Sequence, residues 1–286
     1  KDGVMISTVI YGGQGNVQLK HLFQMLKSAK GQQILSQLER CDKESYQLIE
    51  NVLDKKIGLD DIHAAMLANF LYNEWITNGE EICPGMVFSA HSAGIFNVLL
   101  TTNSANFRDI VNFIRKRARL IEERSCPEEL WLLMTENLAL FSTEVLEQHA
   151  EKFKLAIITD STSGVLAMDE QHLQLLEATA SSEGHIYKIK KLGVKAPYHT
   201  GFLDKSFDDY VQLVNELNIV QNDLYEYIFH YEDLREELLY QWNQMFNWKG
   251  IKENILQRGG EILDLSPNKF ISKQLLKMKQ KEKRNV

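Results

Sequence analysis

The sequence has few cysteines and no long apolar run. Cys41, Cys83 and Cys126 are scattered along the chain, and no two of them form a CxxC pair. So sparse and odd a set argues against a disulfide framework and against a zinc site, and it favours a reducing compartment. No apolar run reaches the roughly 18 residues that a membrane helix needs. We therefore expect a cytoplasmic protein without a membrane segment or a bound metal ion.

An excess of positive charge is also missing. The 286 residues carry a formal net charge of −7, so general attraction to nucleic acid is not expected. One strongly basic stretch, residues 273–284, fits the solvated end of a helix. The first residues, Lys1-Asp2-Gly3 followed by an apolar strand, do not have the pattern of a signal peptide.

The apolar pattern predicts one large α/β domain with a smaller one inserted into it. The chain is long enough for both. Its first part reads as a strand over 4–11, helices over 17–30, 36–52 and 60–77, a strand ending at 90, and helices over 94–101 and 107–123. After residue 127 the pattern changes to short strands alternating with helices. Strands over 129–135, 153–159, 164–169 and 185–192 enclose helices over 142–152 and 170–181, which is the β-α-β-β-α-β order of a ferredoxin-like fold.

These elements give the expected fold class and boundaries. We predict an α/β fold with a large α/β-hydrolase-like domain, built on a parallel sheet from residues 1–127 and 193–286. A ferredoxin-like subdomain occupies residues 128–192.

The stretch Met86-Val87-Phe88-Ser89-Ala90-His91-Ser92-Ala93-Gly94 carries the strongest chemical signal. An apolar strand ends at a serine with small neighbours, and a helical pattern follows. This is the layout of a nucleophile elbow, in which small neighbours permit a sharp turn. Ala90 stands where the usual G-x-S-x-G pattern has its first glycine, so the elbow needs support from the rest of the chain.

Three further landmarks supply that support. The turn Gly12-Gly13-Gln14-Gly15 directly follows the first strand, Arg117 lies on the second helix after Ser92, and His199 lies in Ala196-Pro197-Tyr198-His199-Thr200. Taken together, the chain resembles the malonyl-CoA:acyl-carrier-protein transacylase family, which includes the acyltransferase domains of polyketide synthases. That family has a G-Q-G turn, G-H-S-x-G at its nucleophile, an arginine about 25 residues later, and a histidine in a P-x-H context. The resemblance covers nearly the whole chain.

The resemblance implies a role for each landmark. Ser92 is the nucleophile and His199 its base, because imidazole has a pKa near neutral pH. The backbone N–H groups of Gln14 and Ala93 form the oxyanion hole. A backbone carbonyl orients the histidine, and Asn222, in Ile219-Val220-Gln221-Asn222-Asp223, fits that segment.

The resemblance also implies a malonyl substrate. Arg117 offers a planar two-donor fork that matches a carboxylate. The alternative is a solvated helix arginine, like its neighbours Arg115, Lys116 and Arg119. The bulky Tyr198 fills the space of an extra methyl group. Asp61, with Ile62, stands where the family has a Gln-Pro pair; we expect it in the substrate pocket, where it would weaken malonate recognition if it paired with Arg117.

The expected reaction moves a malonyl or related acyl group from coenzyme A to an acyl carrier protein. Acyl-CoA is then a substrate, no cofactor is needed, and a monomer suffices. Lys188, Lys190, Lys191 and Lys195 are the expected docking patch for the acidic carrier, or else a solvated strand edge. The departures at Ile95, where the family has Glu, and at Asp61 leave open an acyl hydrolase of the same fold that clears carrier proteins. The sequence also leaves open whether the chain acts alone or within a larger synthase.

Overall fold

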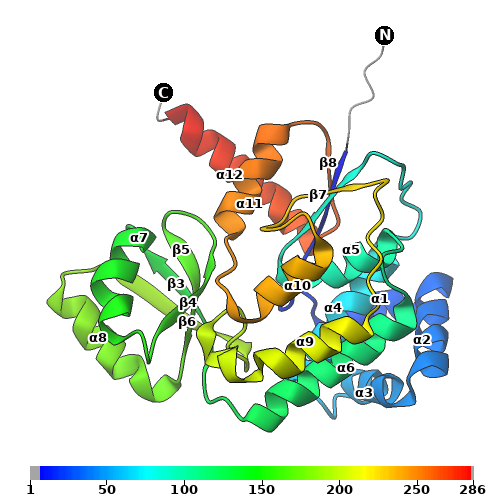
Figure 1. Ribbon diagram of the computed structural model, residues 1–286, viewed down its shortest axis with the longest axis horizontal. Coiled ribbons are helices and arrows are strands. Elements are labelled where there is room, and N and C mark those ends of the chain that lie inside the picture. Colours follow the sequence, from blue (N-terminus) through cyan, green and yellow to red (C-terminus); the bar gives the residue numbers. More distant parts are fainter. Residues whose placement is uncertain (1–6, 285–286) are drawn as a thin grey trace.

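The structure, a computed structural model, describes residues 7–284 and contains two four-stranded sheets (Figure 1). The first sheet is parallel, with the strand order β7-β2-β1-β8. Its strands are β1 (Thr8–Tyr11), β2 (Val87–Ala90), β7 (Glu226–Tyr227) and β8 (Ile262–Asp264). Tyr11 lies opposite Ala90 in the register of β1 and β2. The glycine-rich turn and the serine elbow therefore leave the sheet side by side at the carboxyl ends of its two central strands.

Helices surround this sheet (Figure 1). They are α1 (Leu19–Leu26), α2 (Ala29–Cys41), α3 (Lys43–Leu53), α4 (Ile62–Ile76), α5 (Ile95–Thr101), α6 (Phe107–Arg124), α9 (Phe207–Glu216), α10 (Leu234–Asn243), α11 (Trp248–Arg258) and α12 (Phe270–Arg284). Three helices occupy residues 19–53, where the apolar spacing predicted two. The breaks fall at Ser28 and Asp42, whose side chains cap α2 and α3 by accepting hydrogen bonds from the N–H groups of Gly31 and Glu44. Residues 4–6 of the first predicted strand lie outside the described residues.

The second sheet is antiparallel, with the order β4-β5-β3-β6. Its strands are β3 (Glu129–Thr135), β4 (Lys154–Ile158), β5 (Ser163–Met168) and β6 (Tyr187–Val194), and its helices are α7 (Leu138–Phe141) and α8 (Leu173–Ser182). Both helices lie on the outer side of this sheet (Figure 1). The predicted helix over 142–152 begins earlier, because Asn137 caps α7 and short π and 3-10 turns continue it to His149. The strand order and the two helices confirm the ferredoxin-like pattern.

The buried apolar side chains form two clusters, and the small sheet contributes to both of them. Trp131 and Leu133 of β3 pack under α7 and α8 with Phe141 and Leu176. Leu132 and Met134 alternate with them and lie on the other face of the sheet, since successive side chains of a strand point to opposite sides. The fold class of a parallel α/β domain with a ferredoxin-like part is confirmed, while the exact boundaries at 127/128 and 192/193 stay predictions.

One segment ties the two parts together next to the site. The N–H of Phe246 donates to the carbonyl of Ala156 in β4 at 2.9 Å, and the N–H of Ile158 donates to the carbonyl of Phe246 at 3.0 Å. The Phe246 ring then faces both His91 and His199, at centroid distances of 5.6 and 5.3 Å. This contact sets the position of the small sheet relative to the serine elbow. Within residues 7–284, no helix combines the length and the apolar character that a membrane crossing requires.

Candidate active site

Ser92 lies on a strained turn at the end of β2. Its φ is +48°, a left-handed value that a residue with a Cβ rarely adopts, and a 3-10 turn over Ser92–Gly94 leads directly into α5. A Cβ on Gly94 would lie 2.8 Å from the Gly12 carbonyl oxygen. The glycine is therefore required by the close approach of the two turns, as a nucleophile elbow demands.

The glycine-rich turn packs directly on the elbow. A Cβ on Gly13 would lie 2.4 Å from the His91 carbonyl oxygen and 2.7 Å from Nδ1 of the same residue. Gln14 follows this contact and is half-buried. Ala93 is buried immediately after Ser92. The two turns thus bring both expected donors of the oxyanion hole to the same end of the sheet, and their role there stays a prediction.

Buried asparagines hold this turn in place. Asn73 Nδ2 donates to the Gly12 carbonyl at 3.0 Å and to Asn97 Oδ1 at 3.1 Å, and Asn69 Nδ2 lies 3.3 Å from the same carbonyl. None of these three asparagines was predicted from the sequence. The available signal was the pair Asn69 and Asn73 inside the otherwise mostly apolar helix α4, because a fully buried amide needs a specific partner.

His199 lies within hydrogen-bond reach of the serine. Its Nε2 is 2.7 Å from Ser92 Oγ, so in the Nδ1–H tautomer the hydroxyl donates to Nε2. The histidine is 3% exposed, has a φ of +64°, and donates its backbone N–H to Trp242 O. Burial lowers the pKa of His199 to about 3, and the nearby charge of Arg117 adds to that effect. The imidazole is therefore neutral and able to accept the serine proton at ordinary pH.

The carbonyl beside His199 belongs to Gln241 and not to Asn222, which corrects the expectation. The Gln241 carbonyl acts to raise the pKa of His199, against the larger effect of burial. His199 Nδ1 makes no well-aligned hydrogen bond within residues 7–284. Asn222 has other partners. Its carbonyl accepts the Tyr227 hydroxyl at 2.9 Å, and its Nδ2 donates to Thr102 O at 2.9 Å. Asn222 thus links the strand β7 to the end of α5.

A buried carboxyl anchors the segment that carries Gln241. Glu237 is 0% exposed, and its Oε1 accepts a hydrogen bond from Gln241 Nε2 at 2.9 Å. The same Oε1 lies 2.8 Å from His230 Nδ1, and the N–H of Asn247 donates to His230 Nε2 at 2.8 Å. Glu237 therefore holds both the end of α10 and the segment that packs on His199. Neither Glu237 nor His230 was predicted from the sequence.

Arg117 is buried among aromatic rings. Its side chain is 7% exposed, and its guanidinium carbon lies 4.3 Å from the Tyr198 ring centroid and 5.5 Å from that of Trp242. Its Nε is buried and unpartnered, and within residues 7–284 it forms no ion pair. Its basic neighbours on α6 are paired, as Arg115–Asp42, Lys116–Glu216 and Arg119–Glu44. The solvated alternative therefore describes Lys116 and Arg119, while Arg117 keeps an unpaired charge inside the protein.

Asp61 does not neutralise Arg117. Its Oδ1 accepts the N–H of Ala64 at 2.8 Å and caps α4. Burial raises the pKa of Tyr198, and the charge of Asp61 acts in the same direction. Tyr198 is 4% exposed and stacks on Arg117. Tyr198 thus lies against the guanidinium, while Asp61 forms no ion pair with Arg117 within residues 7–284, and the expected place of both side chains in a substrate pocket stays a prediction.

His91 supports the elbow from the other side. Its ring packs edge-on against Trp248 at a centroid distance of 5.1 Å, and burial lowers its pKa to about 4, with the charge of Lys252 acting in the same direction. Ile95, which follows Gly94, is 1% exposed in the apolar core. Neither side chain is placed to take the serine proton in place of His199, which makes the 2.7 Å contact itself.

The two buried histidines predict that the protein loses stability in mild acid. In the folded state His91 and His199 have pKa values of about 4 and 3, below the ordinary value of 6.5. Between pH 6.5 and 4 the unfolded chain binds more protons, so the free energy of unfolding falls as the pH falls, by up to about 1.4 kcal/mol per pH unit for each histidine. Urea unfolding at pH 7, 6 and 5 measures this slope. His199→Gln should lower it by the contribution of one proton, and an unchanged slope would show that His199 is not buried in its neutral form.

The chain is similar to known proteins in its sequence and in its fold. No family model matches the chain. It is 26% identical over 192 residues to a non-reducing polyketide synthase of Macrophomina phaseolina. The matched region covers 63% of this chain and 8% of the synthase. The malonyl CoA-acyl carrier protein transacylase of Coxiella burnetii superposes with a TM-score of 0.78 at 17% identity, over 95% of this chain and 90% of that one. The fold is that of the malonyl-CoA:acyl-carrier-protein transacylases.

A second transacylase structure contains a partner. It is a malonyl-transacylase in complex with a type II polyketide acyl-carrier protein, with a TM-score of 0.74, 13% identity and coverage of 92% of this chain and 89% of that one. The chain spans only about 8% of the length of the curated polyketide synthases that it matches. The two superpositions cover 95% and 92% of this chain, so the resemblance seen in its motifs is confirmed at the level of the fold.

Proposed function

We propose that this chain is an acyltransferase that moves a malonyl or related carboxyacyl group from coenzyme A to an acyl carrier protein. The contact of 2.7 Å between Ser92 Oγ and His199 Nε2, on a strained elbow, carries this proposal. The unpaired, buried guanidinium of Arg117 supports an acyl group with a free carboxylate. The transacylase fold and the polyketide synthase relatives agree with this chemistry.

The proposed reaction has two half-reactions. Ser92 Oγ attacks the thioester carbonyl while its proton moves to His199 Nε2, and the N–H groups of Gln14 and Ala93 stabilise the oxyanion. His199 then returns the proton to the sulfur of coenzyme A, which leaves as a thiol, and an ester on Ser92 remains. In the second half-reaction, His199 takes the proton of the carrier thiol, the thiolate attacks the ester, and Ser92 regains its hydroxyl. The Gln241 carbonyl stabilises the protonated imidazole in both steps.

Mass spectrometry of the intact protein tests this proposal. Incubation with malonyl-CoA should add the mass of one malonyl group, located on Ser92 by peptide mapping, and addition of a holo carrier protein should remove it. Release into water at the same rate with and without the carrier would instead identify the acyl hydrolase. Absence of any acyl-enzyme with a panel of acyl-CoA thioesters would disprove the proposal.

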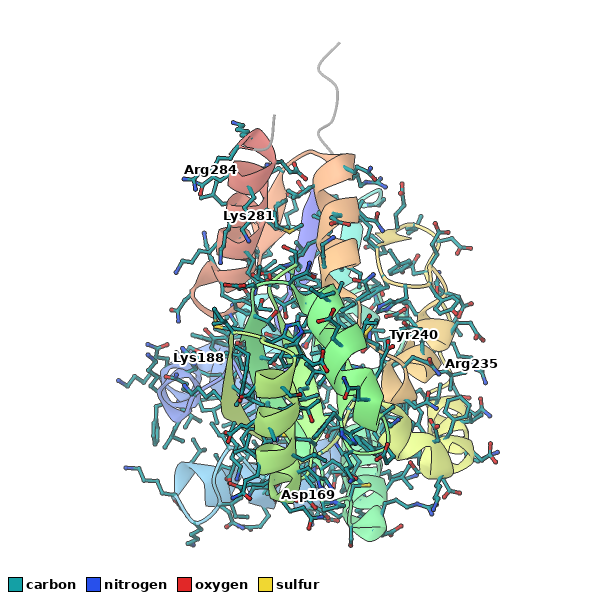
Figure 2. All side chains as sticks on the ribbon, turned by 90° about the vertical axis from the view of Figure 1, so that its left-hand side faces the viewer. Asp169, Lys188, Arg235, Tyr240, Lys281 and Arg284 are labelled. Carbon is teal, nitrogen blue, oxygen red and sulfur yellow. The ribbon has the colours of Figure 1, made fainter. Side chains whose placement is uncertain are left out.

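Carrier docking depends on Lys188 and Lys190 rather than on all four expected lysines. Lys191 pairs with Glu170 and Glu129, and Lys195 pairs with Asp60. Lys188 and Lys190 are exposed, form no ion pair within residues 7–284, and lie opposite Met134 and Leu132 in the sheet. Figure 2 shows Lys188 on the same side of the molecule as the basic end of α12, with Lys281 and Arg284.

We expect that reversing both charges, in Lys188→Glu with Lys190→Glu, lowers transfer to the carrier several-fold and leaves the rate constant for loading at saturating malonyl-CoA within about twofold. Acidic carriers are steered by complementary charge, which acts mainly on the association rate. The same charge change at Lys27 and Lys55, in a different part of the chain, is the control. Rates of the two half-reactions, measured separately at low and high salt, decide the outcome. Equal losses in both half-reactions would contradict a docking role.

A further inference from the structure

A cavity of about 470 Å³ lies between the small sheet and the helices α11 and α12. Leu132 and Met134, on the sheet face turned away from α7 and α8, form one wall, and the turn between β4 and β5 forms another. The lysines that line it are Lys249, Lys252, Lys277 and Lys281. The chemistry described above does not use this cavity.

Lys252 is the unusual member of the lining. Its side chain is 1% exposed, its Nζ lies 5.9 Å from the Trp248 ring centroid, and it forms no ion pair within the described part of the chain. Burial lowers its pKa to about 8, partly offset by Asp160, so the ammonium group is still mostly protonated at neutral pH. A buried ammonium group without a partner is costly. An anion in the cavity would supply the partner.

The acidic groups around the cavity do not fill this role. Glu253 pairs with Lys249 at 2.5 Å. Asp160 Oδ1 accepts hydrogen bonds from the N–H and the hydroxyl of Thr162, which fix its turn. Glu282 lies at the exposed end of α12. The three lysines Lys252, Lys277 and Lys281 have no ion pair within residues 7–284, and they converge on one space.

Two aromatic side chains, His91 and Trp248, connect the serine elbow to the lining of the cavity. The Trp248 ring contacts the His91 ring at 5.1 Å on one side, and its Nε1 donates to Gln274 Oε1 at 2.8 Å on the other. Gln274 lines the cavity, and His91 precedes Ser92 in the chain. A long, linear thioester with its carbonyl at Ser92 has its far end at some distance from the elbow, and this cavity offers that end both apolar contacts and positive charge.

We propose that the cavity binds the phosphate group at the end of the pantetheine arm of the thioester substrate, through Lys252, Lys277 and Lys281. Leu132, Met134 and Met278 contact the arm itself. This inference rests on the proposed acyl transfer for the identity of the ligand. The same phosphate occurs in coenzyme A and on the prosthetic group of a holo carrier protein, so one site serves both half-reactions. Ammonium groups recognise phosphate as point charges.

Calorimetric binding of coenzyme A to the whole chain tests the site without any turnover. Lys252→Met keeps the aliphatic stem and removes the charge, and it should weaken binding by about tenfold or more. The double variant Lys277→Met with Lys281→Met, on the more exposed α12, should do the same without a change in the core. Lys279→Met, on the same helix but outside the lining, is the matched control and should bind as wild type does.

Two further ligands identify what the lysines recognise. 4′-Phosphopantetheine should lose affinity in the Lys252→Met and double variants as coenzyme A does, while pantetheine, which lacks the phosphate, should bind wild type and variants equally. An effect confined to coenzyme A would place the nucleotide phosphates at the lysines and overturn the assignment. Equal loss for pantetheine would also overturn it, because the variants would then act through packing.

The two proposals fail separately in these experiments. Lysine-dependent binding of coenzyme A without any acylation of Ser92 would disprove the acyltransferase proposal and leave the phosphate site standing. Acylation of Ser92 by malonyl-CoA, with coenzyme A binding independent of the three lysines, would do the reverse.

Discussion

Replacement of His199 by alanine is expected to slow the loading of Ser92 by roughly 10²- to 10⁴-fold. A serine hydroxyl is a weak nucleophile at neutral pH, and the neutral imidazole at 2.7 Å is the group placed to take its proton. Ser92→Ala should abolish loading altogether, since the ester then has no oxygen to form on. Single-turnover rates with malonyl-CoA, followed by the mass of the acyl-enzyme, measure both effects.

The control for this prediction is a histidine outside the site. His172 belongs to a short turn before α8 in the small subdomain and should be replaceable by alanine without a change in rate. Circular dichroism and urea unfolding of His199→Ala separate a catalytic loss from a folding defect. Labelling by malonyl-CoA that persists in Ser92→Ala would disprove the mechanism, and a loss of less than about threefold in His199→Ala would rule out His199 as the base.

The pH dependence of loading gives a second measurement on the same residue. With a pKa of about 3, His199 is in its basic form throughout the range from pH 8 to pH 5. The rate constant for acylation should therefore stay flat as pH falls through 6.5, where an ordinary histidine would be half protonated. A tenfold fall between pH 7 and pH 5, in protein that remains folded, would show that the base is more solvated than the structure indicates.

Most residues of the candidate site were predictable because their signals are local. Ser92 and Gly94 are required by one sharp turn, and the glycine at position 13 by one close approach to His91. Arg117 and His199 were identified by the resemblance, and the structure brings both close to Ser92, since the Arg117 charge acts on the His199 imidazole. The β-α-β-β-α-β pattern likewise needs only the order of its elements.

What the sequence could not predict depends on the path of the backbone. The carbonyl beside His199 comes from Gln241, and a backbone oxygen leaves no mark on the identity of its residue, which is why Asn222 was the wrong choice. Lys252 looks like an ordinary helix lysine in the sequence. Lys252 is buried because α11 packs beside the small sheet and α12. The small sheet lies far before α11 in the chain and α12 follows it, so the local sequence does not reveal this packing.

Arg117→Ala should lower malonyl loading by about 30- to 1,000-fold, which corresponds to about 2–4 kcal/mol for a buried charge-assisted pair. The guanidinium is 7% exposed, stacks on Tyr198, and has no carboxylate partner within residues 7–284. A malonyl carboxylate that binds there pairs with a charge that is already desolvated, so the interaction is stronger than at the surface. Acetyl loading should stay constant or rise, because the charge that disfavours a neutral acyl group is gone.

Two variants on α6 make the test specific to the geometry of the guanidinium. Arg117→Lys keeps the charge but loses the two-donor fork, so its malonyl loading should lie between those of wild type and Arg117→Ala. Arg119 lies two positions after Arg117 on the same helix, is exposed, and pairs with Glu44. Its replacement in Arg119→Ala should leave the ratio of malonyl to acetyl loading unchanged. The ratio, measured by competition between the two thioesters, is insensitive to a partial loss of folded protein. If wild type loaded both groups equally well and Arg117→Ala changed neither, Arg117 would not bind a substrate carboxylate, and a neutral acyl group would become the better assignment for this site.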